Sequence, residues 1–214
     1  MALLNKLLKN FIPSKMILQQ LPAGNKKSVL LTFDDGPHPE STPLVLDLLD
    51  KFDAKAFFFV VGERVEERPD LARDIISRGH LIGNHTFSHL DIPRPDYERY
   101  RDDILRCQES IVRATGKSPV FFRPPFGSVT PTILRAAWNC KLKVMRWNQD
   151  SAELSYMRDA KIEERAEHFL KKIHGRAIVL SHDTHPTMPQ FLNLVLPKLA
   201  ALGLDLKTAI KQFA

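Results

Sequence analysis

The stretch SVLLTFDDGP, residues 28–37, guides the interpretation of the rest of the chain. It begins as an apolar run, which predicts a strand over residues 28–33, and it ends on two acids followed by a Gly-Pro pair that stops the strand. Sites of α/β proteins are built at the carboxyl ends of their strands. The neighbouring carboxylates of Asp34 and Asp35 can both stay ionised when buried only if a metal, an arginine or hydrogen bonds lie nearby. Taken alone, the stretch also fits a solvated Asp-Gly turn.

Short apolar runs alternate with helical patterns along the rest of the chain. The pattern predicts further strands over 56–61, 80–83, 120–122, 143–147 and 177–181. It predicts helices over 42–52, 65–78, 97–114, 131–139, 162–174 and 190–202. Such alternation is typical of an α/β fold with a parallel sheet, open or closed into a barrel. Residues 24–214 are expected to form one catalytic domain, preceded by a basic amphipathic segment over 1–23.

Charge and cysteine content exclude several classes of protein. Five of the lysines that give the chain its net charge of +6 lie in the first 27 residues, so the remaining body is close to neutral and nucleic-acid binding is not expected. Cys107 and Cys140 are too few for a disulfide framework and are expected to be reduced and inert. No apolar run approaches the ~18 residues of a membrane span, and no cleavable signal peptide is recognisable.

Leucines and lysines share the first 23 residues at helical spacing. Such a segment can pack on the domain or lie on an anionic membrane surface. We therefore expect a cytoplasmic protein whose first 23 residues pack on the domain, with peripheral membrane contact through residues 1–23 as the alternative, and a monomer in the absence of any symmetry signal.

Two histidines follow the strand predicted at 80–83, in the stretch GNHTFSH over residues 83–89. His85 and His89 are four residues apart and can converge on one cation. The spacing alone often arises by chance, but Asp35 as a third ligand would complete a set of two histidines and one carboxylate that leaves positions open for water and substrate.

Three further groups follow predicted strands. Arg123 lies in FFRPPFG, residues 121–127, where the prolines can hold its guanidinium as a bidentate partner for Asp34, although a surface arginine on a stiff loop is the alternative. The stretch WNQDSAEL covers 147–154, and IVLSHD covers 178–183. His182 can donate a proton near neutral pH, although a histidine at a strand end is often only structural.

Taken together, the ordered set TFDDGP, HTFSH, RPPFG, W-x-x-D-x-x-E-L and VLSHD resembles the polysaccharide deacetylases, the NodB-homology domains of carbohydrate esterase family 4. The resemblance covers about residues 28–210 and implies a distorted (β/α) barrel with mostly parallel strands. It implies a hydrolase that uses a divalent metal, zinc first and cobalt second, to remove the acetyl group from an N-acetylated glycan.

The resemblance also implies roles for individual residues. Asp35, His85 and His89 would hold the metal, Asp34 would be the base that deprotonates the attacking water, and Arg123 would orient Asp34. The backbone N–H of Phe126 would stabilise the oxyanion.

On the opposite side of the implied site, His182 would protonate the departing amine, and Leu180 with Leu154 would line a pocket for the acetyl methyl. The fourth motif departs from the usual Asp-x-x-Asp-Trp, because Glu153 stands at the second acid and Leu154 at the tryptophan, while Asp150 matches the first acid. Two alternatives stay open: a deformylase or amidase for another N-acyl substrate, and a weakly active carbohydrate-binding protein.

Overall fold

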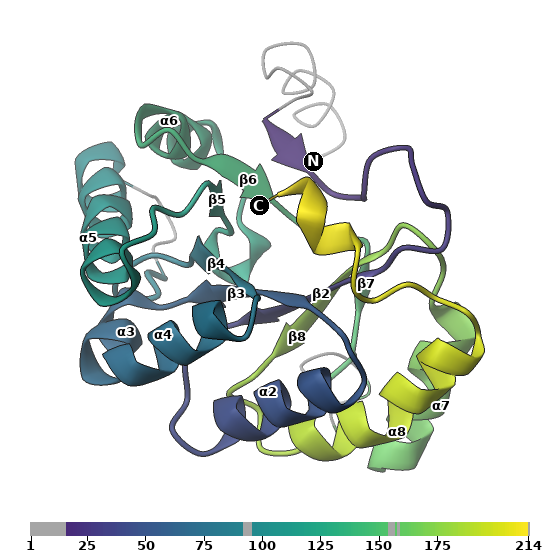
Figure 1. Cartoon of the computed structure of the whole chain (residues 1–214). Coiled ribbons are helices and arrows are strands. Elements are labelled where there is room, and N and C mark those ends of the chain that lie inside the picture. The colour runs from purple at the N-terminus through teal and green to yellow at the C-terminus, as the bar shows by residue number, and fades with distance from the viewer. Residues whose placement is uncertain (1–15, 92–95, 154–156, 158, 214) are drawn as a thin grey trace.

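The computed structural model describes residues 16–91, 96–153, 157 and 159–213. These residues form an eight-stranded sheet in the order β1-β6-β5-β4-β3-β2-β8-β7, in which every neighbouring pair is parallel (Figure 1). The strands are β1 (Ile17–Leu18), β2 (Leu30–Asp34), β3 (Ala56–Val60), β4 (Leu81–Asn84), β5 (Phe121–Phe122), β6 (Lys143–Met145), β7 (Gln149–Asp150) and β8 (Ile178–His182). The predicted parallel α/β sheet is confirmed, and all strands end at the same edge.

The sheet curls into an open barrel. Arg123 follows β5, yet its guanidinium donates to Thr32 and Asp34 on β2, three strands away in the order of the sheet. A flat sheet with strands about 4.8 Å apart could not bring these groups together. The edge strands β1 and β7 are not neighbours, so the barrel is not closed by hydrogen bonds between the described strands.

Helices cover the outer side of the curled sheet (Figure 1). They are α2 (Ser41–Lys51), α3 (Gly62–Glu67), α4 (Pro69–Ser77), α5 (Tyr97–Thr115), α6 (Pro131–Asn139), α7 (Ile162–Lys172) and α8 (Met188–Ala201), with short 3₁₀ turns η1 (Pro125–Gly127) and η2 (Ala209–Gln212). The single helix predicted over 65–78 is wrong. Two helices meet at Arg68, because a proline at position 69 disfavours helical backbone in the preceding residue.

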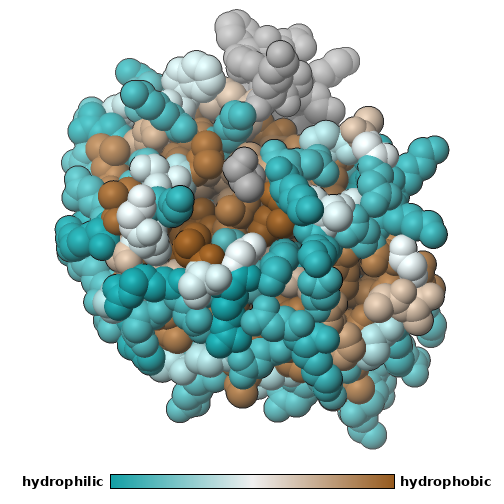
Figure 2. Space-filling model, viewed as in Figure 1, coloured by the Kyte–Doolittle hydropathy of each residue, from teal (hydrophilic) through white to brown (hydrophobic). Residues whose placement is uncertain are grey.

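Apolar residues fill both sides of the sheet. Inside the barrel lie Leu30, Phe57, Phe59, Phe121, Met145 and Ile178, and Ala209 and Ile210 of η2 join this cluster. Because strand residues alternate, Leu31, Phe33, Phe58 and Val179 face the other way, into the larger core beneath the helices. Figure 2 shows the molecule from the same side as Figure 1. Apolar side chains lie in the hollow at the centre of the face in view, and hydrophilic ones cover most of the surface around it. Full burial of one such side chain contributes about 1.5–3 kcal/mol.

The predicted N-terminal segment is only partly covered by the described residues. Residues 1–15 lie outside them, while 17–18 form β1, which pairs with β6, and Leu21 is buried. The stretch from 16 to 23 is therefore part of the folded domain, because its apolar side chains complete the edge of the sheet. No helix of the described residues is long and apolar enough to span a membrane.

Candidate active site

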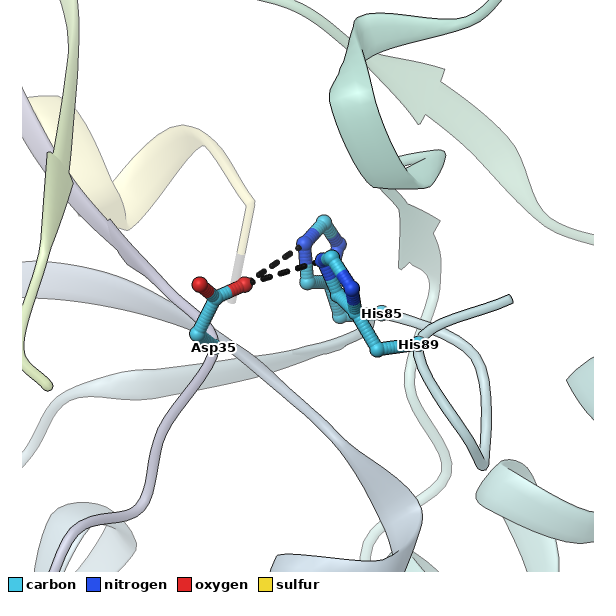
Figure 3. Close-up of side chains that lie close together, drawn as sticks. All are labelled: Asp35, His85 and His89. Atoms are coloured by element: carbon cyan, nitrogen blue, oxygen red, sulfur yellow. Dashed lines mark ion pairs between the residues drawn. The ribbon is translucent and has the colours of Figure 1, made fainter. Parts of the chain in front are cut away.

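Asp35, His85 and His89 converge at the carboxyl ends of β2 and β4 (Figure 3). Oδ1 of Asp35 lies 3.3 Å from Nε2 of His85 and 3.1 Å from Nε2 of His89. The three ligand atoms all lie within 4.8 Å of one another. The predicted set of two histidines and one carboxylate is therefore assembled in space.

The hydrogen bonds of this cluster fit a cation. Nδ1 of His85 lies 2.7 Å from the carbonyl oxygen of Arg123, which can only accept, so Nδ1 carries a proton and Nε2 is the nitrogen that faces Asp35. Oδ1 of Asp35 is buried and accepts no hydrogen bond of acceptable geometry from the described residues. Burial raises the pKa of Asp35, but the nearby histidines outweigh it and hold that pKa well below its usual range. Two imidazole nitrogens and a carboxylate oxygen that converge in this way form a donor set that a cation can bind.

Asp34 and Arg123 form a buried ion pair beside this cluster. The side chains are 4% and 0% exposed, and Nη1 of Arg123 donates to Oδ1 of Asp34 over 2.7 Å. Burial lowers the pKa of Arg123 and Asp34 opposes this effect, so the guanidinium stays charged. The other carboxylate oxygen of Asp34, Oδ2, is 3.9 Å from Nε2 of His85 and faces the cluster of Asp35, His85 and His89.

The predicted pairing of Asp34 with Arg123 is confirmed, but the predicted bidentate geometry is wrong. The same Nη1 also donates to Thr32, while Nε and Nη2 donate to the carbonyl oxygens of Met145 and Arg146, at the end of β6. The guanidinium also lies over the ring of Phe59, 4.2 Å from its centroid. Arg123 therefore ties the ends of β2, β5 and β6 together, and Thr32 is a part of the site that sequence reasoning missed.

A second carboxylate–histidine pair lies at the ends of β8 and β7. Nδ1 of His182 lies 2.9 Å from Oε1 of Glu153, whose side chain is 2% exposed. Burial by itself lowers the pKa of His182, but the Glu153 hydrogen bond and the charges of Asp34, Glu153 and Asp35 raise it to about 9. His182 is therefore protonated at neutral pH and carries a donor proton on Nε2.

The changed fourth motif keeps this pair intact. Glu153 reaches His182 with one oxygen and accepts from the Ser151 hydroxyl with the other. The Asp150 carboxylate accepts from the backbone N–H of Ala152, which has a left-handed φ of 63°. This hydrogen bond of Asp150 shapes the turn that carries Glu153. Ser151 is a second site residue that sequence reasoning missed, although it stands inside the motif.

The remaining predicted site residues lie at the same rim. Leu180 shares the face of β8 with His182, since the two are two residues apart on a strand. Leu154 lies outside the described residues. The Phe126 ring is 66% exposed and its centroid is 4.9 Å from that of His89, and the backbone N–H of Phe126 is not used in any hydrogen bond found among the described residues.

Buried Asp183 and half-buried Trp147, which the sequence interpretation did not use, support the TFDDGP and RPPFG stretches respectively. Asp183 is completely buried, and burial raises its pKa to about 7, opposed by the Thr42 hydroxyl that donates to it. A side chain at Gly36 would collide with the Asp183 carboxylate, which accounts for the glycine after Asp35. Trp147 packs against Gly127 and lies 5.5 Å from the Arg123 guanidinium.

Residues 22–145 match the family model described as polysaccharide deacetylase. The chain belongs to the polysaccharide deacetylase family. It is 39% identical over 129 residues to a peptidoglycan-N-acetylglucosamine deacetylase from Bacillus cereus, which is 60% of this chain and 47% of that protein. It is 32% identical over 201 residues to a peptidoglycan-N-acetylglucosamine deacetylase from Listeria monocytogenes, covering 94% of this chain and 42% of the relative. The chain thus spans less than half the length of these two curated relatives.

Other members of the polysaccharide deacetylase family match over more of their length. A chitooligosaccharide deacetylase from Bradyrhizobium is 35% identical over 161 residues, which is 75% of this chain and 72% of the relative. Among solved structures, a peptidoglycan N-acetylglucosamine deacetylase superposes with a TM-score of 0.82 at 28% identity, covering 94% of this chain and 92% of the other. A CE4 family pseudoenzyme from Bacillus anthracis superposes with a TM-score of 0.80 at 27% identity, over 90% and 67%.

Proposed function

We propose that this chain hydrolyses the N-acetyl group of an N-acetylated amino sugar in a glycan such as peptidoglycan or a chitooligosaccharide. The observation that carries the proposal is the arrangement of three groups around one rim: the Asp35/His85/His89 set, the Asp34–Arg123 ion pair, and the protonated His182 held by Glu153. Hydrolysis of an amide needs a base for water, a stabiliser for the oxyanion and an acid for the amine, and this rim offers a candidate for each.

The three residues Asp35, His85 and His89 would hold a divalent metal, with zinc first and cobalt second. Their nitrogen and carboxylate donors match the ligands of catalytic zinc, and three protein ligands leave a position open. When bound, such an ion polarises a carbonyl group and makes a water molecule acidic enough to react near neutral pH.

Asp34 is placed to take the proton of the attacking water at Oδ2, because Oδ1 is engaged by Arg123. The water oxygen forms a bond to the acetyl carbonyl carbon, and the charge on the carbonyl oxygen is met by the backbone N–H of Phe126. Nε2 of His182 then gives its proton to the amide nitrogen as the C–N bond breaks, and the products are acetate and a free amino sugar. Leu180 lines the site on the side of His182.

The test is acetate release from N-acetylglucosamine oligomers and peptidoglycan fragments by metal-stripped protein, before and after zinc or cobalt is returned. Asp34→Asn is the variant that removes the base, and Asp47→Asn is its control, because Asp47 is an exposed acid on α2. Release that depends on metal, survives in the control and falls roughly 10²–10⁴-fold in Asp34→Asn is the expected result.

Other outcomes overturn the proposal in different ways. Formate or another acid in place of acetate assigns a different N-acyl substrate. Stoichiometric metal binding without any product assigns a binding role instead of catalysis.

The compartment and the assembly remain predictions. We propose a cytoplasmic monomer and, because residues 16–23 belong to the folded domain, we limit the proposed membrane contact to residues 1–15. Deleting residues 1–15 would then abolish sedimentation with anionic liposomes, and unchanged sedimentation would contradict the membrane contact.

A further inference from the structure

The two histidines of the candidate metal site are held in different ways. The ring of His85 is oriented directly by the carbonyl oxygen of Arg123 and its side chain is 3% exposed. The ring of His89 is 29% exposed, and among the described residues no hydrogen bond fixes its second nitrogen. Apart from its contacts with Asp35 and with the Phe126 ring, the position of His89 depends on the backbone of the loop that carries it.

That backbone is in a conformation that needs support. Thr86 has a φ of 66° and His89 a φ of 50°, and both values lie in the left-handed region that residues with a Cβ rarely adopt. A β-branched residue such as Thr86 is especially unfavourable there, so this backbone conformation is strained. Something outside the loop must hold it in place.

Asp103 of α5 provides that support. Its Oδ2 accepts from the backbone N–H of Phe87 over 2.8 Å and from that of Ser88 over 3.1 Å, and its Oδ1 accepts from the Ser88 hydroxyl over 3.0 Å. The Phe87 N–H also lies 3.1 Å from the backbone oxygen of Asp103. Asp103 of α5 thus satisfies the last two of the three backbone N–H groups that lie between the two histidines, those of Phe87 and Ser88.

Other contacts hold the start of the loop, and the Leu90 N–H, directly after His89, donates to the Thr86 hydroxyl within the loop itself. Oδ1 of Asn84 accepts from Thr86, and the N–H groups at the start of α3 donate to the carbonyl oxygens of Thr86 and Phe87. Asp103 alone among the described side chains accepts from the backbone of Ser88, the residue directly before His89.

We propose that Asp103 is a positioning residue that sets the place of His89 and thereby the metal affinity of the site. The proposal rests on the proposed metal centre. It makes α5, which carries none of the candidate ligands, part of the metal-binding apparatus.

The test compares Asp103→Ala, Asp103→Asn and Ser88→Ala with Asp102→Ala as the matched control. Asp102 is the neighbouring acid on the same helix, its side chain is 64% exposed, and it pairs with Arg101. Zinc affinity is measured by titration calorimetry or chelator competition, and the cobalt-loaded proteins are compared by their visible absorption spectra.

Removing a residue that supports a ligand costs about 10–100-fold in metal affinity, and we expect that range for Asp103→Ala. Asp103→Asn keeps an oxygen acceptor for the loop N–H groups and should recover most of the affinity. Ser88→Ala loses only one hydrogen bond and should weaken binding by less than Asp103→Ala. The cobalt spectrum of Asp103→Ala should also change, because a displaced His89 alters the ligand geometry.

Wild-type zinc affinity and an unchanged cobalt spectrum in a folded Asp103→Ala protein would overturn the proposal. Melting temperatures of the metal-free variants show whether each is folded. His85→Ala sets the level expected without the metal site. If the wild-type chain binds metal no better than His85→Ala, the proposed metal centre itself fails, which is a different outcome from a loss of the Asp103 effect alone.

Discussion

Two carboxylate–histidine clusters face each other at the rim of the barrel, and they have similar contact distances. Asp35 lies 3.1 Å from His89 and 3.3 Å from His85, while Glu153 lies 2.9 Å from His182. The two clusters differ in the nitrogen that faces the acid. His85 turns Nε2 toward Asp35 because its Nδ1–H donates to the carbonyl oxygen of Arg123. His182 instead turns Nδ1 toward Glu153 and carries a proton on Nε2.

The difference shows that a short distance between an acid and a histidine does not define its chemistry. In the first cluster Nε2 of the neutral ring and the carboxylate would both offer lone pairs to a cation bound between them. In the second cluster the carboxylate stabilises the imidazolium, so the pair can deliver a proton. The partner of the other ring nitrogen decides between the two roles.

Replacing Asp35 by Asn, in the first cluster, should have the largest effect on metal binding and acetate release. The amide has nearly the same shape but no charge, so zinc affinity should fall by more than about 100-fold, beyond the usual cost of losing a supporting residue. Acetate release should fall with it. The measurement is zinc content and affinity beside acetate release, with Asp102→Asn as control. Metal binding equal to wild type would show that Asp35 is not a ligand.

Replacing Glu153 by Gln is the matched change in the second cluster. Metal affinity should stay within about twofold of wild type, since Glu153 touches no ligand, but the pKa of His182 should fall from about 9 toward or below its ordinary value. At about pH 8 acetate release should fall roughly tenfold or more, because most His182 would be unprotonated. Glu163→Gln, an exposed acid of α7, is the control.

The pH dependence follows from the same pair. The protonated form of His182 is the donor, so activity is present below its folded-state pKa and is lost as pH rises through it. The protonated pair also stabilises the fold below about pH 6.5, and this stability is lost as pH rises through about 9. The positive charge of a bound cation lowers the pKa of His182. Nuclear magnetic resonance titration should therefore give a higher pKa for His182 in the metal-free protein than in the metal-bound protein. A titration that shows no difference between wild type and Glu153→Gln would contradict the assignment.

His80 is a buried histidine whose ring is not paired with a carboxylate in any contact among the described residues, and it extends the comparison. Replacing it should have the smallest effect on activity. His80 is 2% exposed, and its Nδ1 accepts from the backbone N–H of Ala56. Burial, aided by the charges of Lys55 and Arg78, lowers its pKa to about 4. The unfolded chain therefore binds the proton first, and stability falls as pH falls from about 6.5 toward 4, by on the order of 3 kcal/mol.

His80→Asn keeps an acceptor for the Ala56 N–H and removes the titrating ring. Its unfolding free energy, measured by urea denaturation between about pH 4 and 7, should vary less with pH than that of wild type, while acetate release at neutral pH stays unchanged. An equal pH dependence in both proteins would show that His80 does not titrate in this way.

Much of the site could be predicted from the sequence because of one property of parallel sheets. The motifs with Asp34, Asp35, His85, Arg123 and His182 each follow an apolar run, and the carboxyl ends of parallel strands share one edge. Helix positions were also close, since a buried helix face repeats in sequence. The helix predicted over 65–78 was divided in the structure because its proline outweighed the apolar pattern.

The parallel α/β fold, the candidate ligands and the candidate pairing of Asp34 with Arg123 followed from the sequence, because the alternation of strands and helices and the chemistry of the residues can be read from short stretches of the chain. Only the tertiary structure decided the curl that brings Arg123 to β2, the proton position on His85, the reach of Glu153 to His182, and the support of the His89 loop by Asp103. The two-residue strands β1 and β7 also belong to this second group. Each depends on contacts between segments far apart in the chain, and neither a two-residue strand nor a hydrogen-bond partner leaves a periodic signal in the sequence.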